Sequence, residues 1–147
     1  MQVDPRGQRF IAAVTTVVLI TVLVWGSGAL LAAQAVVFAV ATFCGLRYSP
    51  YGLVFKVLIR PRLAPPQELE DEAAPRFAQG VGFAFALVGT VGYTMGITWL
   101  GIGATALALG AAFLNAAFGF CLGCEIYLLT RRVRAGGRRG TSPIEKY

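Results

Sequence analysis

Histidine is absent from the 147-residue sequence, and charged residues make up only 14% of it. Without histidine the chain lacks the commonest metal ligand and the commonest acid–base residue, so a metal centre or a Ser-His hydrolase is difficult to build. Soluble domains carry about 25% charged residues. The low charge, the 56% hydrophobic content and the mean hydropathy of +0.67 therefore indicate one small integral membrane domain.

Acidic residues are also scarce. The chain has 7 aspartates and glutamates and 13 lysines and arginines, so its net charge is +6. A basic chain can bind nucleic acid, but here the cations gather at the borders of apolar runs, as they do in the cytoplasmic loops of membrane proteins. We therefore expect the lipid bilayer to be the main partner, and we expect no nucleic-acid binding.

Long hydrophobic runs are the dominant feature of the chain. Four of them are typical of membrane-spanning helices, at about residues 10–27, 29–46, 83–100 and 104–130. Two short uncharged turns, one around residues 26–28 and one around residues 101–103, join the runs in pairs. The predicted fold class is all-α, an integral membrane four-helix bundle.

The segments outside these runs are polar. They are a short lead, a middle segment and a basic tail expected to be disordered, at residues 1–9, 47–82 and 131–147. Within the middle segment, residues 51–60 are too short to span and carry two cations, so we predict a short interfacial helix there. Residues 67–72 are predicted to be an acidic, solvated stretch.

The cations of the chain lie in the lead, the middle segment and the tail, whereas both tight turns are uncharged. The positive-inside rule therefore predicts a multi-pass protein of the cell membrane with both termini in the cytoplasm. Trp25 and Trp99 agree with this orientation, because each lies at the end of a run where an outer aromatic belt is expected.

Small residues recur at three- and four-residue spacing in the last two runs, which lets helix backbones approach closely. They are Gly89, Gly92 and Gly96 in the third run, and Ala112, Ala116, Gly119 and Gly123 in the fourth. Packing within one subunit is the favoured interpretation, and a homo-oligomer is the alternative. Asn115, close to these residues, is explained by a buried hydrogen bond between helices.

Three cysteines are present, and two of them form a C-x-x-C followed by a carboxylate, at Cys121, Cys124 and Glu125. A carboxylate inside a spanning helix costs about 2–3 kcal/mol, so bulk packing alone does not account for it. Measured from Thr130 by the helical rise, Cys121 lies about 13 Å deep, and Cys124 and Glu125 about 7–9 Å. Cys44 lies about 4–5 Å deep from the same side. These four residues therefore predict a thiol site in the cytoplasmic half of the bilayer.

The chemistry of this site depends on thiolate formation. The C-x-x-C lies near the C-terminal end of its predicted helix, where the helix dipole opposes negative charge. A bridge from Cys44 to Cys121 or Cys124 is therefore the more plausible disulfide, with the remaining cysteine resolving it. A buried thiolate needs a compensating cation, such as Arg47, Arg9 or Arg131, or else Glu125 as the proton acceptor. The alternatives are that the cysteines are packing residues and that Glu125 pairs with Arg47 or Arg131. No metal site is expected.

Local motifs are spread over nearly the whole chain, at Val3–Phe10, Ser49-Pro50, Arg60–Leu63, Pro65-Pro66, Pro75–Gln79 and Phe120–Glu125. Together they resemble an uncharacterised family of small four-helix integral membrane proteins from bacteria, mostly actinobacteria, which is catalogued as a domain of unknown function. The motifs are specific for membership and say little about activity. Members are often encoded near thioredoxin-like or rhodanese-like proteins, which implies thiol or sulfur chemistry at the membrane.

The leading hypothesis is a thiol-active membrane protein that exchanges electrons or sulfane sulfur with a thioredoxin-like or rhodanese-like cytoplasmic partner. Cys121 and Cys124 are the expected reactive pair and Cys44 a third participant. One rival is a small oligomeric transport or channel subunit for a sulfur oxyanion or another small solute, and another is an accessory structural subunit. The cofactor is unknown, because the sequence identifies no quinone site, nucleotide site or Gly-rich phosphate loop.

Overall fold

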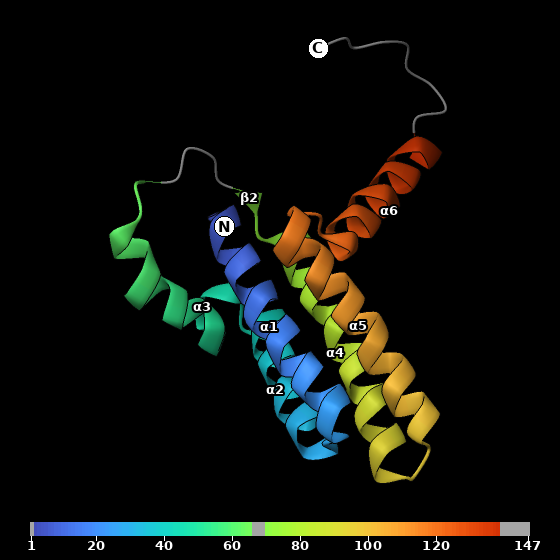
Figure 1. Cartoon of the computed structure of the whole chain (residues 1–147). Helices are drawn as coiled ribbons and strands as arrows, with labels where there is room; N and C mark the ends of the chain where they lie inside the picture. Colours follow the sequence, from blue (N-terminus) through green and yellow to red (C-terminus); the bar gives the residue numbers. More distant parts are fainter. Residues whose placement is uncertain (1, 66–69, 139–147) are drawn as a thin grey trace.

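The computed structural model describes residues 2–65 and 70–138, and this part of the chain is almost entirely helical (Figure 1). Its α-helices are α1 (Pro5–Trp25), α2 (Gly28–Phe43), α3 (Pro50–Val54), α4 (Ala73–Thr94), α5 (Thr98–Phe118) and α6 (Leu122–Arg138). The shorter elements are η1 (Leu46–Tyr48), η2 (Phe55–Ile59), η3 (Arg60–Arg62), and the two-residue strands β1 (Gln2–Val3) and β2 (Glu70–Asp71), which pair antiparallel. The all-α prediction is confirmed.

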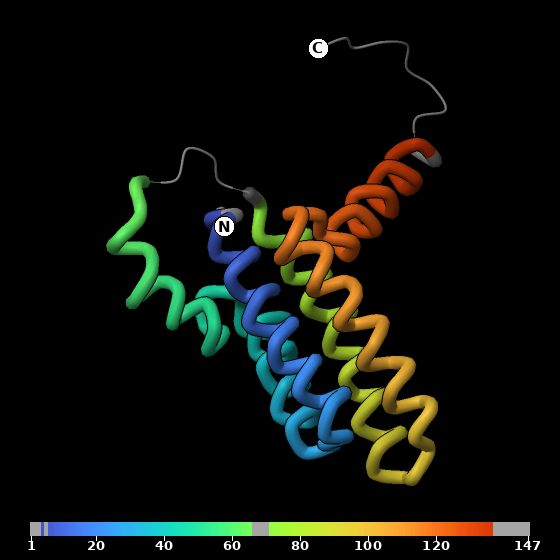
Figure 2. The backbone as a smooth tube through the Cα atoms, in the orientation of Figure 1, coloured from blue at the N-terminus to red at the C-terminus, as the bar shows by residue number. Residues whose placement is uncertain are grey.

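Four helices, α1, α2, α4 and α5, pack side by side and are called the core helices below. Helix α1 contacts α2 and α5, and α4 contacts the same two helices from the other side. The N-terminus, β2 and α6 lie at one end of this group, here called the α6 end, and α3 lies beside α1 toward that end (Figure 1). The turns from α1 to α2 and from α4 to α5 lie at the opposite end, as the path of the chain in Figure 2 shows.

The interior of the core helices is small and mostly apolar, with Gln34 and Thr105 as fully buried polar residues. Leu19 and Val22 of α1, Leu31 and Phe38 of α2, and Ala86 of α4 are buried in one cluster. Many large apolar side chains point outward instead, among them Val17, Val36 and Leu107. Within the described residues, three helices are long and apolar enough to cross a membrane, at Arg6–Trp25, Ala73–Thr94 and Thr98–Phe118, and Gly28–Phe43 is a shorter apolar helix.

The first predicted turn is confirmed. Gly26 ends α1 in the left-handed region with φ 61°, and the Ser27 hydroxyl accepts the Leu30 N–H at 3.1 Å as the N-cap of α2. The prediction of a second turn at residues 101–103 is wrong, because the chain turns at Gly96, with φ 78°, and residues 101–103 lie inside α5. Gly101 allows close packing there, since an added Cβ would lie 2.9 Å from Tyr93 Cγ.

Close packing of small residues within one chain is confirmed for Gly89 and Gly92. A Cβ on Gly89 would lie 2.7 Å from Leu31 Cδ2, and a Cβ on Gly92 would meet the backbone of Gly101. These glycines therefore allow α4 to approach α2 and α5. A homo-oligomer stays a prediction.

The fourth apolar run is divided between two helices, so the prediction of one continuous helix over residues 104–130 is wrong. Helix α5 ends at Phe118, and Gly119 follows in the left-handed region with φ 68°, its N–H bonded to Asn115 O at 2.9 Å. Helix α6 then begins at Leu122 and leads away from the core helices (Figure 1). It packs on the first turns of α4, where the Phe77 and Tyr127 rings lie 5.7 Å apart.

The segments outside the core helices differ in part from the predictions. The short helix expected at residues 51–60 is present as α3 and η2, while its interfacial position stays a prediction. The prediction of a disordered tail from residue 131 is wrong up to Arg138, because α6 continues to that residue. Residues 139–147 lie outside the described part of the chain. The prediction of a solvated stretch at residues 67–72 is wrong for Glu72, which is buried. Residues 66–69 also lie outside the described part of the chain.

Helix α4 begins ten residues before the predicted third span, at Ala73 rather than at residue 83. Arg76 explains how this polar first stretch is held in place. Its guanidinium donates to Thr42 O at 2.7 and 3.1 Å, so a side chain of α4 satisfies a carbonyl at the C-terminal end of α2.

Candidate functional site

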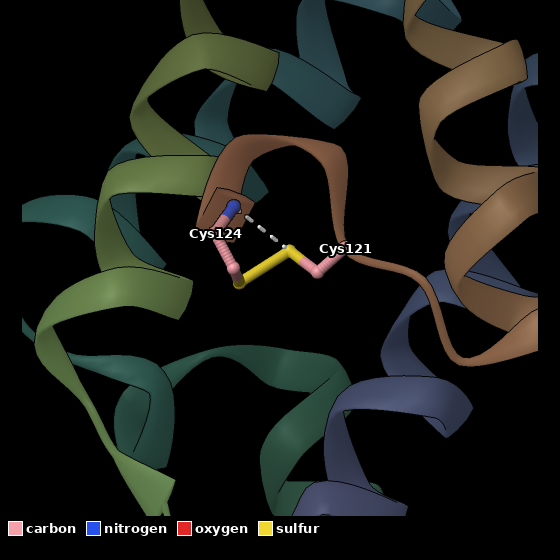
Figure 3. Close-up of a disulfide and its surroundings, with 2 residues drawn as sticks. All are labelled: Cys121 and Cys124. Carbon is pink, nitrogen blue, oxygen red and sulfur yellow. Dashed lines mark hydrogen bonds between the residues drawn. A yellow bond between two sulfur atoms is a disulfide. The ribbon is translucent and has the colours of Figure 1, made fainter. Parts of the chain in front are cut away.

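Cys121 and Cys124 form a disulfide at the α6 end, with their Cα atoms 5.2 Å apart (Figure 3). The prediction of a bridge from Cys44 to either of them is wrong. Cys44 is a free, exposed thiol at the C-terminal end of α2. The two cysteines of the C-x-x-C are therefore bonded to each other, and Cys44 is not part of the bridge.

The disulfide lies at the N-terminus of α6. Cys121 immediately precedes the first helical residue, and its carbonyl accepts the Glu125 N–H at 3.1 Å. The Cys124 N–H donates to Cys121 Sγ at 3.3 Å, as the dashed line in Figure 3 shows. This overturns the expectation that the motif lies near a helix C-terminus. At a helix N-terminus the free N–H groups and the dipole stabilise a thiolate, so the geometry favours thiol chemistry.

The break before the disulfide is held by a contact with α1. The Arg9 guanidinium donates to Ala116 O at 3.3 Å and to Ala117 O at 3.5 Å. These carbonyls belong to the last turn of α5. Because the helix ends at Phe118, no later turn of α5 supplies N–H donors to them. On the other side of the break, Gly123 packs directly on α4, since an added Cβ would lie 2.6 Å from Ala78 Cβ. Arg9 and Gly123 thus fix the start of α6 from two directions.

A cavity of about 240 Å³ lies beside the disulfide, and Cys121 forms part of its wall. Most of the wall is apolar and is supplied by all the core helices together with α6. Three polar side chains from three helices also line it: Thr15 of α1, Gln79 of α4 and Asn115 of α5.

None of these three side chains has a hydrogen-bond partner among the residues that the structure describes, although Thr15 is only 3% exposed. The expected hydrogen bond from Asn115 to another helix is therefore wrong. The side chain instead borders an open space, and its hydrogen-bonding capacity is unused.

The comparison with known families agrees with the motifs of the sequence. A family model described as a domain of unknown function (DUF4395) matches residues 3–132. The chain belongs to this family. No curated protein and no solved structure shows a significant match. The matched region includes the core helices, the disulfide and most of α6, so the site described here lies within the part of the chain that defines the DUF4395 family.

Glu125 lies on the first turn of α6, next to the disulfide, and is exposed to solvent. Its position is thus compatible with the expected role as proton acceptor, which stays a prediction. Arg131, one of the expected ion-pair partners, instead has its guanidinium carbon 5.9 Å from the centre of the Tyr127 ring. An exposed carboxylate at a helix N-terminus is favourable in its own right, because it interacts with the positive end of the dipole.

The sequence did not identify Thr15 and Gln79 as residues of this DUF4395 site. It offered Arg9 only as a cation to stabilise a thiolate, and not as a donor to the end of α5. Thr15 lies in an apolar run, and Gln79 belongs to a motif that indicates family membership but no site. The signal for the helix break was present, because Gly119 lies two residues before Cys121 and glycine is the usual residue after a helix C-terminus. In the described ranges there is no group of three or more residues suited to hold a metal ion.

Proposed function

We propose that this member of the DUF4395 family spans the cell membrane as a four-helix bundle with its α6 end in the cytoplasm. Its Cys121–Cys124 disulfide exchanges electrons with a thioredoxin-like or rhodanese-like cytoplasmic protein. The observation that carries the proposal is the disulfide at the N-terminus of α6. A helix N-terminus is where redox-active cysteines obtain a stabilised thiolate.

The membrane part of the proposal is supported by the surface of the core helices. Three of them are long and apolar enough to cross a bilayer, and their outward side chains are apolar. Helix α2 has 16 residues and is therefore about 24 Å long, slightly shorter than a hydrocarbon core of about 30 Å. Local thinning of the bilayer accommodates such a difference.

The orientation is supported by the distribution of cations. Arg6, Arg9 and Arg76 all lie at the α6 end, where each donates to a backbone carbonyl of another segment. Arg131, Arg132 and Arg134 extend from the same end on α6. The opposite end carries exposed Trp25 and Trp99. Arginine at one end and tryptophan at the other is the pattern expected for a cytoplasmic α6 end and an outer aromatic belt.

The exchange proceeds in two balanced steps. A thiolate of the partner attacks Cys124 Sγ, the Cys121–Cys124 bond breaks, and Cys121 leaves as a thiolate held at the helix N-terminus. The second thiol of the partner then breaks the mixed disulfide, so the partner becomes oxidised and Cys121 and Cys124 become a dithiol. Two electrons pass to this chain, and Glu125 and water exchange the accompanying protons.

The test uses the full chain in lipid nanodiscs, with a reduced bacterial thioredoxin as the probe partner. After the reaction, free thiols are counted with a maleimide that adds mass. We expect one tagged thiol, Cys44, before the reaction and three after it.

Cys44→Ser is the matched control, because it removes the free thiol and leaves the disulfide. It is expected to change from zero tags to two. A disulfide that resists thioredoxin in the folded protein, and opens only after denaturation, would contradict the proposal.

A further inference from the structure

We propose that the cavity beside Cys121 binds the ring of a quinone, and that this quinone accepts the two electrons of the Cys121–Cys124 dithiol. The inference rests on the proposed thiol–disulfide exchange and adds the electron acceptor. Cys121 is the link between the two reactions, because it belongs to the disulfide and also lines the cavity.

The size of the cavity fits an aromatic ring. It encloses about 240 Å³. An apolar protein cavity of about 150 Å³ is large enough to bind benzene. The space beside Cys121 therefore has room for a substituted ring. Its wall is formed largely by alanine, leucine and phenylalanine side chains, which suit an apolar ligand that reaches the site from the bilayer.

The polar groups of the cavity fit the two carbonyl oxygens of a quinone. Thr15 can donate one hydrogen bond, and the side-chain amides of Gln79 and Asn115 can each donate two. All three line the cavity from different helices and lack partners within the described part of the chain. Thr15 is buried, and Gln79 and Asn115 are half-buried. Donors that face a mostly apolar cavity gain a hydrogen bond when an acceptor enters it, so a ligand with acceptor oxygens would be stabilised here.

The absence of charge on the cavity wall argues against charged ligands, and its polar groups argue against purely apolar ones. None of its described lining residues is charged. A nucleotide or a sulfur oxyanion would be buried without a compensating cation, which is strongly unfavourable. A lipid acyl chain would satisfy the apolar wall and leave Thr15, Gln79 and Asn115 unpaired. A neutral ring with carbonyl acceptors satisfies both kinds of surface.

The reaction balances without a further reagent. Two electrons leave the Cys121 and Cys124 sulfurs as the S–S bond forms. They reduce the two carbonyls of the quinone to hydroxyls, and the two thiol protons end on those oxygens. The products are the disulfide and one quinol, and the disulfide is ready to oxidise another partner dithiol. Each partner dithiol oxidised therefore yields one quinol.

The test follows the absorbance of duroquinone, a fully substituted benzoquinone whose ring has no unsubstituted carbon for thiol addition. The full chain in nanodiscs is reduced, freed of reductant and mixed with increasing duroquinone. We expect a saturable rate and one quinol per disulfide formed. Asn115→Leu removes the side-chain amide and Thr15→Val removes the hydroxyl, and each is expected to raise the half-saturating quinone concentration about five- to tenfold.

Thr21→Val is the matched control for Thr15→Val. Both threonines lie on α1, but the Thr21 hydroxyl donates to Val17 O at 2.9 Å and is not among the lining residues of the cavity. The control is expected to keep the native half-saturating concentration. Ala112→Phe, which fills the cavity, is expected to abolish quinone reduction while leaving the exchange with thioredoxin intact.

The two proposals fail separately. If thioredoxin opens the disulfide but duroquinone is not reduced, or reacts without saturation and equally in Asn115→Leu, the quinone site is overturned and the exchange stands. If thioredoxin does not open the disulfide of the folded chain, the exchange itself is overturned. Saturable reduction that weakens in both donor variants and not in Thr21→Val supports the quinone site.

Discussion

Arg9 of α1 donates a hydrogen bond to Ala116 O of α5, 3.3 Å away and 107 residues later in the chain. The contact closes the C-terminal turn of α5 shortly before the break that positions Cys121. A residue of the polar lead thus supports the disulfide from the opposite end of the sequence. The same cation that supports the proposed membrane orientation also has a structural role.

Removing Arg9 is expected to loosen this break. Arg9→Ala leaves Ala116 O and Ala117 O to water, and because Arg9 is exposed we expect the free energy of unfolding to fall by only about 1 kcal/mol. The amides of Gly119 and Phe120 should exchange with solvent faster, which hydrogen-exchange mass spectrometry in detergent measures. Arg131→Ala removes a cation outside this contact and serves as the control. Equal exchange in the two variants would exclude the proposed role of Arg9.

Gly119 is expected to be the residue that ends α5. Its φ of 68° is unfavourable for a residue with a Cβ, so Gly119→Ala should lower the free energy of unfolding by about 1 kcal/mol. Gly103→Ala is the matched control, because Gly103 lies inside α5 with no neighbour within 4 Å of an added Cβ. That change should be neutral or slightly stabilising. Thermal unfolding of both variants in detergent tests the difference, and identical melting temperatures would contradict it.

Glu72 is expected to be important for the link between α2 and η1. Its buried carboxylate accepts the Leu46 N–H at 2.9 Å. Glu72→Ala leaves that N–H without a partner and should destabilise the fold by about 1–3 kcal/mol. Glu72→Gln keeps an acceptor oxygen and should lose less than half as much. The order of the two melting temperatures is the measurement, and the reverse order would refute the hydrogen-bond explanation.

Asp4 predicts a pH dependence at the start of α1. Burial raises the pKa of this carboxyl, but hydrogen bonds from the Arg6 backbone and guanidinium, together with its charge, outweigh burial and hold the pKa below its ordinary value of 3.8. The folded chain therefore binds this proton more weakly than the unfolded chain. The stabilisation is present above the unfolded pKa and is lost as the pH falls through the lower folded pKa.

Asp4→Asn separates this titration from helix capping, because asparagine is also a good N-cap residue. Melting temperatures of the native chain and the variant, measured between about pH 2 and 6 around the ordinary carboxyl pKa, should converge at the acid end. A constant difference over the whole range would show that the Asp4 charge does not contribute.

The candidate site was predictable only in part. Cys121, Cys124 and Glu125 were identified from their spacing, because a thiol pair and a carboxylate are unusual in an apolar run. The predicted disulfide from Cys44 was wrong, because the pairing of the cysteines depends on where α6 begins. A C-x-x-C at a helix N-terminus has its sulfurs close together, whereas the same residues within one long helix were expected to pair elsewhere.

The cavity could not be predicted in the same way. Thr15, Gln79 and Asn115 lie far apart in the sequence and share no motif, and each alone is compatible with an ordinary helix. Their common position arises only when α1, α4 and α5 pack together. The absence of hydrogen-bond partners for them among the described residues is likewise a property of the packed helices.

Local sequence patterns were enough to predict the all-α fold and the cations at the borders of its apolar runs. Apolar runs and their charged borders are local properties, and they specify helices whatever else the chain does. Which glycine ends a helix depends on contacts between segments that are distant in the sequence. Gly103 continues α5 and Gly119 ends it, because only at the second site do Arg9 and the packing of α6 on α4 stabilise the interrupted backbone. That choice brings the disulfide to a helix N-terminus and beside the cavity.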